Sequence, residues 1–288
     1  MATPTTRPFL KWPGGKYRLV PELQQAFSAS RQCADGKLIE PFVGSAAVFL
    51  NTGFDRYLLG DTNTHLIGLY EDLRDGRETF MDECAALFHP DNNTAARYYA
   101  LRDEFNNGAG RRRRSALFLY LNRHGYNGLC RYNSRGEFNT PFGQMIKPYF
   151  PRKEMVAFLQ RVRRKQTIRF VSQGFRETML RARRGDIVYC DPPYVPLSRT
   201  ASFTDYHAGG FGWQDQEMLA ATAARLAQRG VRVVVSNHDT AAIRRLYSDY
   251  GARLRKLNVR RSISCNGSRR ALVGEIIATF REPREHDS

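Results

Sequence analysis

The stretch "DIVYCDPPY" (Asp186–Tyr194) joins a short apolar run to an acid, two prolines and an aromatic ring. The run "IVYC" has the length and composition of a buried strand. Neither proline has a backbone N–H to donate, and each restricts the residue before it, so the turn after the strand is stiff. In an open α/β sheet ligands lie beyond the carboxyl ends of the strands, so this turn is predicted to face a ligand.

The same alternation of strand and helix continues on both sides of this stretch. Residues 37–61 read as strand, small-residue turn, helix and strand, and residues 63–123 are helical in pattern. From residue 168 onward strands alternate with helices, and the segments 253–264 and 271–280 predict a closing antiparallel hairpin. This pattern predicts the α/β class, a mostly parallel sheet with helices on both faces.

Composition indicates the partner. The 288 residues include 45 Lys+Arg against 28 Asp+Glu, a formal net charge of +17. A charge of this size predicts a polyanionic partner, and the arginine forks match phosphate oxygens and guanine edges. Nucleic acid is therefore favoured over a membrane surface.

The five cysteines are scattered without a CxxC pair, and the six histidines show no metal-ligand spacing. We therefore expect reduced thiols and no metal. The start of the chain lacks an apolar signal core, and no apolar run is long enough to span a bilayer. These features predict a cytoplasmic protein that does not insert into a membrane.

Two further strand ends carry polar or glycine residues. The first runs into "EPFVG" (Glu40–Gly44), where glycine lets the backbone approach a ligand closely. The second ends in Asp61, where an acid of a nucleotide-binding βαβ unit accepts hydrogen bonds from ribose hydroxyls. Taken alone, a tight turn and a helix cap explain these residues about equally well.

Asp191, Pro192, Pro193 and Tyr194 are the predicted catalytic residues. A carboxylate and a fixed carbonyl together accept both hydrogens of an exocyclic amino group, and Tyr194 offers a face for a planar base, which predicts a pocket for adenine or cytosine. An aromatic amine is a poor nucleophile because its lone pair is delocalised. Two acceptors that hold its hydrogens favour a tetrahedral nitrogen and localise that lone pair for direct attack. A covalent intermediate on a cysteine is then unnecessary.

The segment 122–147 interleaves arginines with tyrosines and phenylalanines amid glycines and asparagines. This mixture is typical of a loop or hairpin that contacts nucleic acid. By contrast, the run "RRRR" (Arg111–Arg114) precedes a predicted helix, and a solvated helix face explains it as well as a phosphate contact does.

Motifs along nearly the whole chain carry a resemblance to a known family. They are "FLKWPGGKY" (Phe9–Tyr17), "EPFVG" (Glu40–Gly44), "LGDTN" (Leu59–Asn63), "YLNRHGYNGLCRYNSRGEFNTPFG" (Tyr120–Gly143), "DPPYVPLS" (Asp191–Ser198), "SNHDT" (Ser236–Thr240) and "RRSISCNG" (Arg260–Gly267). In these motifs and their order the sequence resembles the Dam-type DNA N6-adenine methyltransferases. Members of that family use S-adenosylmethionine (AdoMet) and modify GATC.

The resemblance implies an architecture. It is a Rossmann-like AdoMet-dependent methyltransferase sheet with helices on both faces and an inserted, mainly helical DNA-recognition domain that carries a β-hairpin. Residues 1–63 and 152–288 would form the AdoMet-binding catalytic domain, and residues 64–151 the inserted domain.

The resemblance also implies roles for single residues. Those matching family positions around AdoMet are Trp12, Lys16, Phe42, Gly44, Asp61 and Asp191, with Asp61 expected on the ribose. Those matching positions that face the bases are Lys11, Leu129, Arg131 and Pro141. Tyr126 and Asn127 match residues that enter the base stack or fill the space of a flipped adenine. Arg102, Asn133 and Ser198 match phosphate contacts, which position the protein without reading sequence.

This chain departs from the family pattern at two positions. Ala46 stands where many AdoMet-binding turns have a second glycine. Alanine serves there if its φ is negative, and we expect unimpaired binding. Met145 stands where the family commonly has an aromatic residue. It can contact a thymine methyl, which leaves discrimination at one inner base pair undetermined by the sequence.

The resulting hypothesis is an enzyme that flips adenine out of duplex DNA and transfers a methyl group from AdoMet to N6, leaving S-adenosylhomocysteine. We expect a monomer, bacterial or phage-derived, that associates with the nucleoid through DNA. The alternatives are an RNA adenine methyltransferase and a DNA-binding regulator on the same fold. The intact Asp191–Tyr194 turn argues against the regulator, because binding alone needs no pocket for an amino group.

Overall fold

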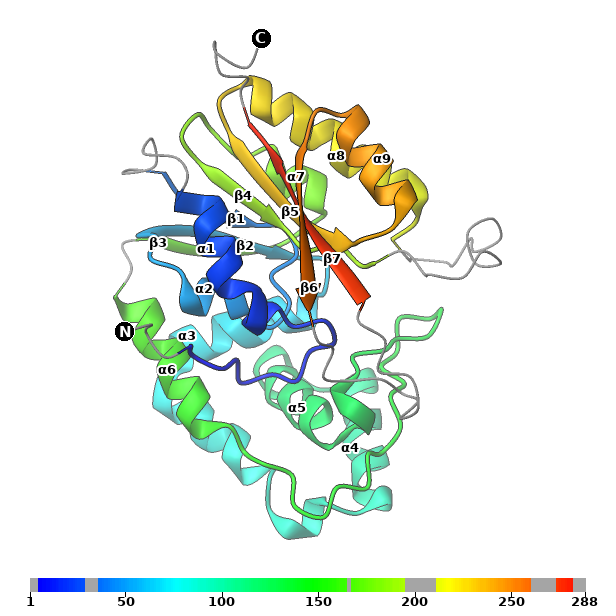
Figure 1. Cartoon of the computed structure of the whole chain (residues 1–288). Coiled ribbons are helices and arrows are strands. Elements are labelled where there is room, and N and C mark those ends of the chain that lie inside the picture. The colour runs from blue at the N-terminus through cyan, green and yellow to red at the C-terminus, as the bar shows by residue number, and fades with distance from the viewer. Residues whose placement is uncertain (1–4, 29–35, 165–166, 195–210, 260–272, 282–288) are drawn as a thin grey trace. The chain divides into compact units, whose positions relative to one another are not determined.

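The computed structural model describes residues 5–28, 36–164, 167–194, 211–259 and 273–281 (Figure 1). The chain divides into two compact units whose segments are interleaved along the sequence. The first unit comprises Met1–Pro21, Val43–Gly53 and Asp61–Ser172, and the second comprises Glu22–Phe42, Phe54–Gly60 and Gln173–Ser288. The insertion expected at 64–151 falls inside the first unit, and its assignment to DNA recognition stays a prediction.

The second unit is built on a mixed β-sheet. Its strands lie in the order β2, β1, β4, β5, β7 and β6. The first four run parallel, and β7 pairs antiparallel with both β5 and β6. The α/β class and the antiparallel pairing of the two last strands are thereby confirmed. The strands are β1 (Leu38–Glu40), β2 (Arg56–Asp61), β4 (Ile187–Cys190), β5 (Arg232–His238), β6 (Arg253–Val259) and β7 (Val273–Phe280).

Buried apolar runs explain why these segments form inner strands. All four residues of β4 are buried, as are Val233 to His238 of β5, which is typical of strands covered on both faces. Helix α8 packs on β5 and β7, α7 on β1 and α9 on β6. The helices of this unit are α1 (Val20–Ser28), α7 (Phe175–Met179), α8 (Trp213–Gln228) and α9 (Ala241–Asp249).

The first unit is mainly helical, and its long helices are drawn in cyan and green in Figure 1. Helix α5 packs against α3 and α4, and it is buried without a break from Ser115 to Asn122. The rings of Phe9, Tyr70 and Phe158 form an aromatic cluster in the core of this unit. The elements are η1 (Lys16–Leu19), α2 (Ala47–Asn51), α3 (Thr64–Ala86), η2 (Pro90–Asn92), α4 (Ala95–Asn107), α5 (Arg111–His124), η3 (Tyr126–Gly128), α6 (Arg152–Arg163) and β3 (Thr167–Ser172).

The segment after α5 folds back on itself. Isolated antiparallel bridges join Gly125 to Phe142 and Tyr132 to Phe138, and the Asn133 N–H donates to the Glu137 carbonyl at the tip (2.9 Å). These contacts form the irregular hairpin that the aromatic and basic pattern of 122–147 predicts.

The arginine run at the start of α5 is engaged within the protein. Ion pairs join Arg111 to Glu71, Arg112 to Glu83 and Arg113 to Glu104. These pairs are surface ion pairs with neighbouring helices, as on a solvated helix face, and contact of the run with phosphate stays a prediction.

Candidate functional site

The Asp-Pro-Pro-Tyr turn follows β4, and its first carboxylate is held from the neighbouring strand. The Ser236 hydroxyl of β5 donates to Asp191 Oδ1 (3.0 Å), and the Tyr189 hydroxyl lies 2.9 Å from the same Ser236 oxygen. Because the single hydroxyl hydrogen of Ser236 goes to Asp191, Tyr189 donates to Ser236. A chain of two hydrogen bonds therefore orients the carboxylate.

The proline end of the turn is held from the helices. Gln216 of α8 donates from Nε2 to the Pro193 carbonyl (3.1 Å). The Gln216 Oε1 atom in turn accepts from Asn237 Nδ2 (3.1 Å) and from the Tyr247 hydroxyl (3.2 Å). Gln216, Asn237 and Tyr247 are fully buried, so this network has one arrangement in which its polar groups are satisfied.

Tyr194 closes the turn beside β5. Its ring centroid lies 4.1 Å from that of His238, with an interplanar angle of 60°. Burial raises the pKa of Tyr194, and the Asp191 carboxylate adds to this rise. The phenol is therefore neutral at physiological pH, and the side chain is not a base there.

The cysteines near these segments are unsuited to nucleophilic chemistry. Burial raises the pKa of Cys130 to about 12 and that of Cys190 well above its ordinary value. Since the thiolate is the nucleophile, both are inert at neutral pH. Cys265 lies outside the described residues.

In the first unit, three of the residues expected around AdoMet meet in one turn. Gly44 has a φ of +45°, and a Cβ built on it would lie 2.8 Å from Trp12 Nε1. The Gly44 N–H donates to Asp61 Oδ2 (3.2 Å), and the Asn63 N–H donates to Asp61 Oδ1 (3.0 Å). Burial raises the pKa of the Asp61 carboxyl above its ordinary value, and the hydrogen bonds from these backbone N–H groups reduce that rise. Each Asp61 oxygen keeps capacity for a further hydrogen bond.

The conformation of Ala46 differs from the expectation. Its φ is +61°, in the left-handed region, so the condition of a negative φ is not met. Ala46 caps α2: its N–H donates to the Val43 carbonyl (2.8 Å), and its own carbonyl accepts from Leu50 (3.0 Å). The turn imposes this conformation at the position where glycine is common, and alanine tolerates it with some strain.

Lys16 and Phe42, also expected around AdoMet, contact other groups of the protein. Lys16 is buried, and its Nζ donates to the Gly14 carbonyl (2.8 Å). In the second unit Phe42 stacks on Phe175, with centroids 5.5 Å apart, and meets Phe211 edge-on. Phe42 therefore belongs to an aromatic cluster at the end of β1.

The residues expected to face bases gather around the turn that follows α5. The Tyr126 N–H donates to the Pro141 carbonyl (2.9 Å), and Asn127 has a φ of +53°. The turn exposes Tyr126, of which 49% is accessible, together with Asn127. Lys11, from the N-terminal motif, lies against this turn at Gly128. Leu129 is half-buried next to it.

Three other residues expected on DNA are engaged within the hairpin. Arg131 donates from Nε to Asn139 Oδ1 (2.8 Å), and Arg102 donates to the Thr140 carbonyl (3.3 Å). Asn133 donates to Glu137 Oε2 (2.7 Å) and accepts from two backbone N–H groups of the tip. These contacts shape the hairpin, whereas Ser198 lies outside the described residues.

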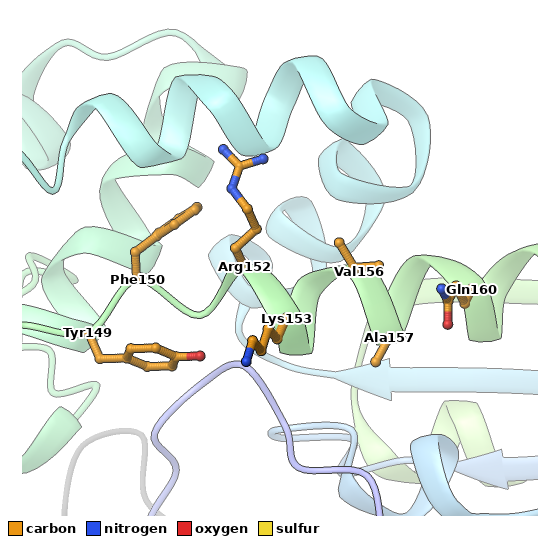
Figure 2. A pocket seen from close by; sticks show the side chains of 7 residues that line it. All are labelled: Tyr149, Phe150, Arg152, Lys153, Val156, Ala157 and Gln160. Atoms are coloured by element: carbon orange, nitrogen blue, oxygen red, sulfur yellow. The ribbon is translucent and has the colours of Figure 1, made fainter.

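A surface cavity of about 630 Å³ lies beside the start of α6 (Figure 2). Its lining includes Tyr149, Phe150 and Lys153, and none of the expected site residues. Among the described residues no group of three or more His, Cys, Asp or Glu side chains could hold a metal ion. No described helix is long and apolar enough to cross a membrane.

Sequence reasoning missed the residues that hold the turn after β4. Ser236 and Asn237 lie in the quoted motif "SNHDT", but no role was assigned to them. The sequence does allow Gln216 to be predicted as buried, because it lies on the same apolar helix stripe as Leu219, Ala220 and Ala223. A lone amide on such a stripe predicts a buried hydrogen-bond network.

An oriented carboxylate in a held turn after a central parallel strand is typical of the class of ligand-binding α/β proteins. Comparison with known proteins specifies it: the D12 class N6 adenine-specific DNA methyltransferase family matches residues 12–263, and the chain belongs to this family. It is therefore an adenine-specific DNA methyltransferase.

Individual relatives are similar over almost their full length. The DNA adenine methylase of Escherichia coli (strain K12) is 46% identical over 275 residues, covering 96% of this chain and 95% of that protein. The DNA adenine methylase of Serratia marcescens is 47% identical over 276 residues, covering 96% and 98%. That of Vibrio cholerae serotype O1 (strain ATCC 39315 / El Tor Inaba N16961) is 46% identical over 275 residues, covering 95% and 96%.

Proposed function

We propose that this chain methylates N6 of an adenine flipped out of duplex DNA at GATC, with AdoMet as the methyl donor. Membership in the D12 class and relatives named DNA adenine methylase support adenine in DNA as the substrate, and the resemblance of the motifs to the Dam-type family supports GATC. The observation that carries the chemistry is the turn after β4, in which Ser236 holds the Asp191 carboxylate and Gln216 holds the Pro193 carbonyl, next to the proposed acceptor Pro192.

The turn acts on the amino group of the base. Asp191 accepts one amino hydrogen and the Pro192 carbonyl accepts the other, which localises the nitrogen lone pair. Because Ser236 holds the carboxylate and Gln216 holds the adjoining Pro193 carbonyl, neither acceptor must reorganise during the reaction. Tyr194 stacks on the base.

The proposed AdoMet residues are Trp12, Lys16, Phe42, Gly44, Asp61 and Asp191. The contact between Gly44 and the Trp12 indole supports this fit, because it brings two of these residues together at a position where a Cβ would clash with the indole. Asp61 supports it too: its carboxylate is oriented by two N–H groups and can accept from ribose hydroxyls. When bound, AdoMet supplies an electrophilic methyl group.

DNA is proposed to meet the exposed turn and hairpin of the first unit. Tyr126 and Asn127 would enter the base stack, and Lys11, Leu129, Arg131 and Pro141 would face the bases. Arg102, Asn133 and Ser198 would contact phosphates. The net charge of +17 supports a polyanionic partner.

The test is transfer of labelled methyl from AdoMet to duplexes that contain GATC, each single-base variant of it, or no adenine at that site, with an RNA duplex at equal salt. We expect label on adenine N6 in GATC alone. Asp191→Ala should abolish transfer while DNA affinity changes less than about threefold. Substantial turnover by Asp191→Ala would contradict the proposed chemistry, label on RNA alone would identify an RNA methyltransferase, and DNA binding without transfer would identify a regulator.

A further inference from the structure

The buried side-chain amide of Asn122 holds the backbone of Lys11 at the end of α5 by hydrogen bonds. The Lys11 N–H donates to Asn122 Oδ1 (2.9 Å), and Asn122 Nδ2 donates back to the Lys11 carbonyl (2.7 Å). Asn122 Nδ2 also donates to the Gly128 carbonyl (3.0 Å). Asn122 is 0% exposed, so this reciprocal pair is shielded from water and joins Lys11 to the exposed turn.

The aliphatic stem of Lys11 is held by the same turn. Gly128 has a φ of +68°, and a Cβ built on it would lie 2.3 Å from Lys11 Cβ and 2.9 Å from Lys11 Cδ. Lys11 therefore lies directly across the backbone of Gly128, where only glycine fits.

The ammonium group of Lys11 has two acceptors in the protein. Its Nζ donates to Met145 Sδ (2.9 Å) and to the Arg123 carbonyl (3.3 Å). An ammonium carries three N–H donors. In the described part of the chain no acceptor lies within hydrogen-bond distance of the third.

Two hydrogen bonds hold the backbone at and beside Met145. Asn93 donates from Nδ2 to the Met145 carbonyl (2.8 Å), and the Gly143 N–H donates to the His124 carbonyl (2.8 Å). A thioether is a weak, uncharged acceptor on an unbranched side chain. It can therefore orient an ammonium without neutralising its charge.

We propose that Met145 is a positioning residue: with the Arg123 carbonyl it takes up two N–H groups of Lys11 and directs the third toward one hydrogen-bond acceptor on a base edge. Met145 thereby sets discrimination at that base pair. This assignment rests on the proposed function, because the acceptor belongs to DNA.

The chemistry of a single fixed donor defines what it accepts. In the major groove guanine offers N7 and O6, adenine offers N7 and thymine offers O4, whereas cytosine offers only an amino donor. An ammonium held in place therefore favours a purine or thymine and rejects cytosine. When its orientation is lost, Lys11 becomes a mobile point charge that no longer distinguishes these edges.

The experiment compares full-length variants on the GATC duplex and its single-base-pair variants. Met145→Leu keeps the size but removes the acceptor, and Met145→Gln restores one. Ile146→Ala is the matched control, because Ile146 is 100% exposed and adjacent. We expect Met145→Leu to reduce the ratio of kcat/KM between GATC and the variant that places cytosine at one position by roughly three- to tenfold, the effect of one hydrogen bond.

We expect Met145→Gln to recover most of that ratio and Ile146→Ala to leave it unchanged. In a Lys11→Ala background Met145→Leu should change the ratio by less than about twofold, since the pair is coupled. The assignment is overturned if Met145→Leu keeps the wild-type ratio, if its loss is spread over all positions, or if its effect persists without Lys11. If the wild-type chain methylates no duplex, the proposed function fails, and this assignment fails with it.

Discussion

Gly44→Ala tests the turn in which Trp12 and Asp61 meet. Gly44 has a φ of +45°, and an added Cβ would lie 2.8 Å from Nε1, 3.1 Å from Cδ1 and 3.3 Å from Cε2 of Trp12. The residue cannot move freely away, because its N–H donates to Asp61 and its carbonyl accepts from the Tyr70 hydroxyl. The methyl group must therefore displace the indole or distort the turn.

The magnitude follows from two effects. The left-handed conformation costs a residue with a Cβ about 1–2 kcal/mol. Overpacking against the indole adds about 1–3 kcal/mol. We therefore expect Gly44→Ala to lower the free energy of unfolding by about 2–5 kcal/mol and Tm by roughly 5–15 °C. AdoMet affinity should fall as well if Trp12 contacts the ligand.

The matched control is Ala46→Gly in the same turn. Ala46 has a φ of +61° and is 0% exposed. Glycine relieves about 1 kcal/mol of strain, but it loses a buried methyl worth about 0.8 kcal/mol and gains unfolded-state entropy. These effects nearly cancel, so the free energy of unfolding should stay within about 1 kcal/mol of wild type.

The assay is thermal and urea unfolding followed by circular dichroism, with an AdoMet titration of each variant by calorimetry. If Gly44→Ala unfolds like the wild type, the argument from φ and the Trp12 contact is refuted. If Ala46→Gly lowers the free energy of unfolding by more than about 2 kcal/mol, the strain assigned to Ala46 is wrong. A sharp rise in AdoMet affinity on Ala46→Gly would contradict the expected unimpaired binding.

Three further predictions follow from individual contacts. Ser236→Ala removes the donor to Asp191 and should lower kcat roughly tenfold with little change in KM; an unchanged kcat in single-turnover assays would exclude this positioning role. Burial, with the nearby charges of Lys11 and Arg123, lowers the pKa of His124 to about 4. Because the unfolded histidine binds a proton near pH 6.5, the free energy of unfolding should fall by about 3 kcal/mol between pH 6.5 and 4. Urea unfolding of wild type and His124→Gln checks this, since the variant should lose that slope. Asp61→Asn leaves one of two partly buried N–H groups without its acceptor and should destabilise the apo chain by about 1–3 kcal/mol, measured by urea unfolding; equal stability would contradict it.

The helices and strands of the fold can be predicted from the sequence because they depend on local patterns. The strands β1, β2 and β4 lie where the sequence predicts strands, and the helices α3, α4 and α5 lie within the segment 63–123 that is helical in pattern, to within one residue of its end. Alternation of apolar and polar residues encodes strands and helices, and glycine and proline mark their ends. The backbone conformation of Ala46 was not readable, because alanine gives no local signal for a positive φ that the surrounding turn imposes.

For the candidate site, the sequence predicts which residue types take part but not how they are held in place. The Asp191–Tyr194 turn reveals its acceptors through the chemistry of carboxylates and prolines. The groups that hold it were not readable, since Ser236 is 45 residues from Asp191 and Gln216 is 23 residues from Pro193. Neither spacing corresponds to a helix or strand period, so no sequence rule connects these pairs.

By itself the sequence determined the α/β class, the order of the elements, the polyanionic partner and the acceptor turn after β4. Each of these depends on residue type, local periodicity or total charge, which the chain carries without folding. Only the tertiary structure decided that Asn122 pins Lys11 across 111 residues and that Met145 meets its ammonium across 134. Such contacts depend on how separate elements pack, because burial selects among many partners that are equally compatible with the sequence.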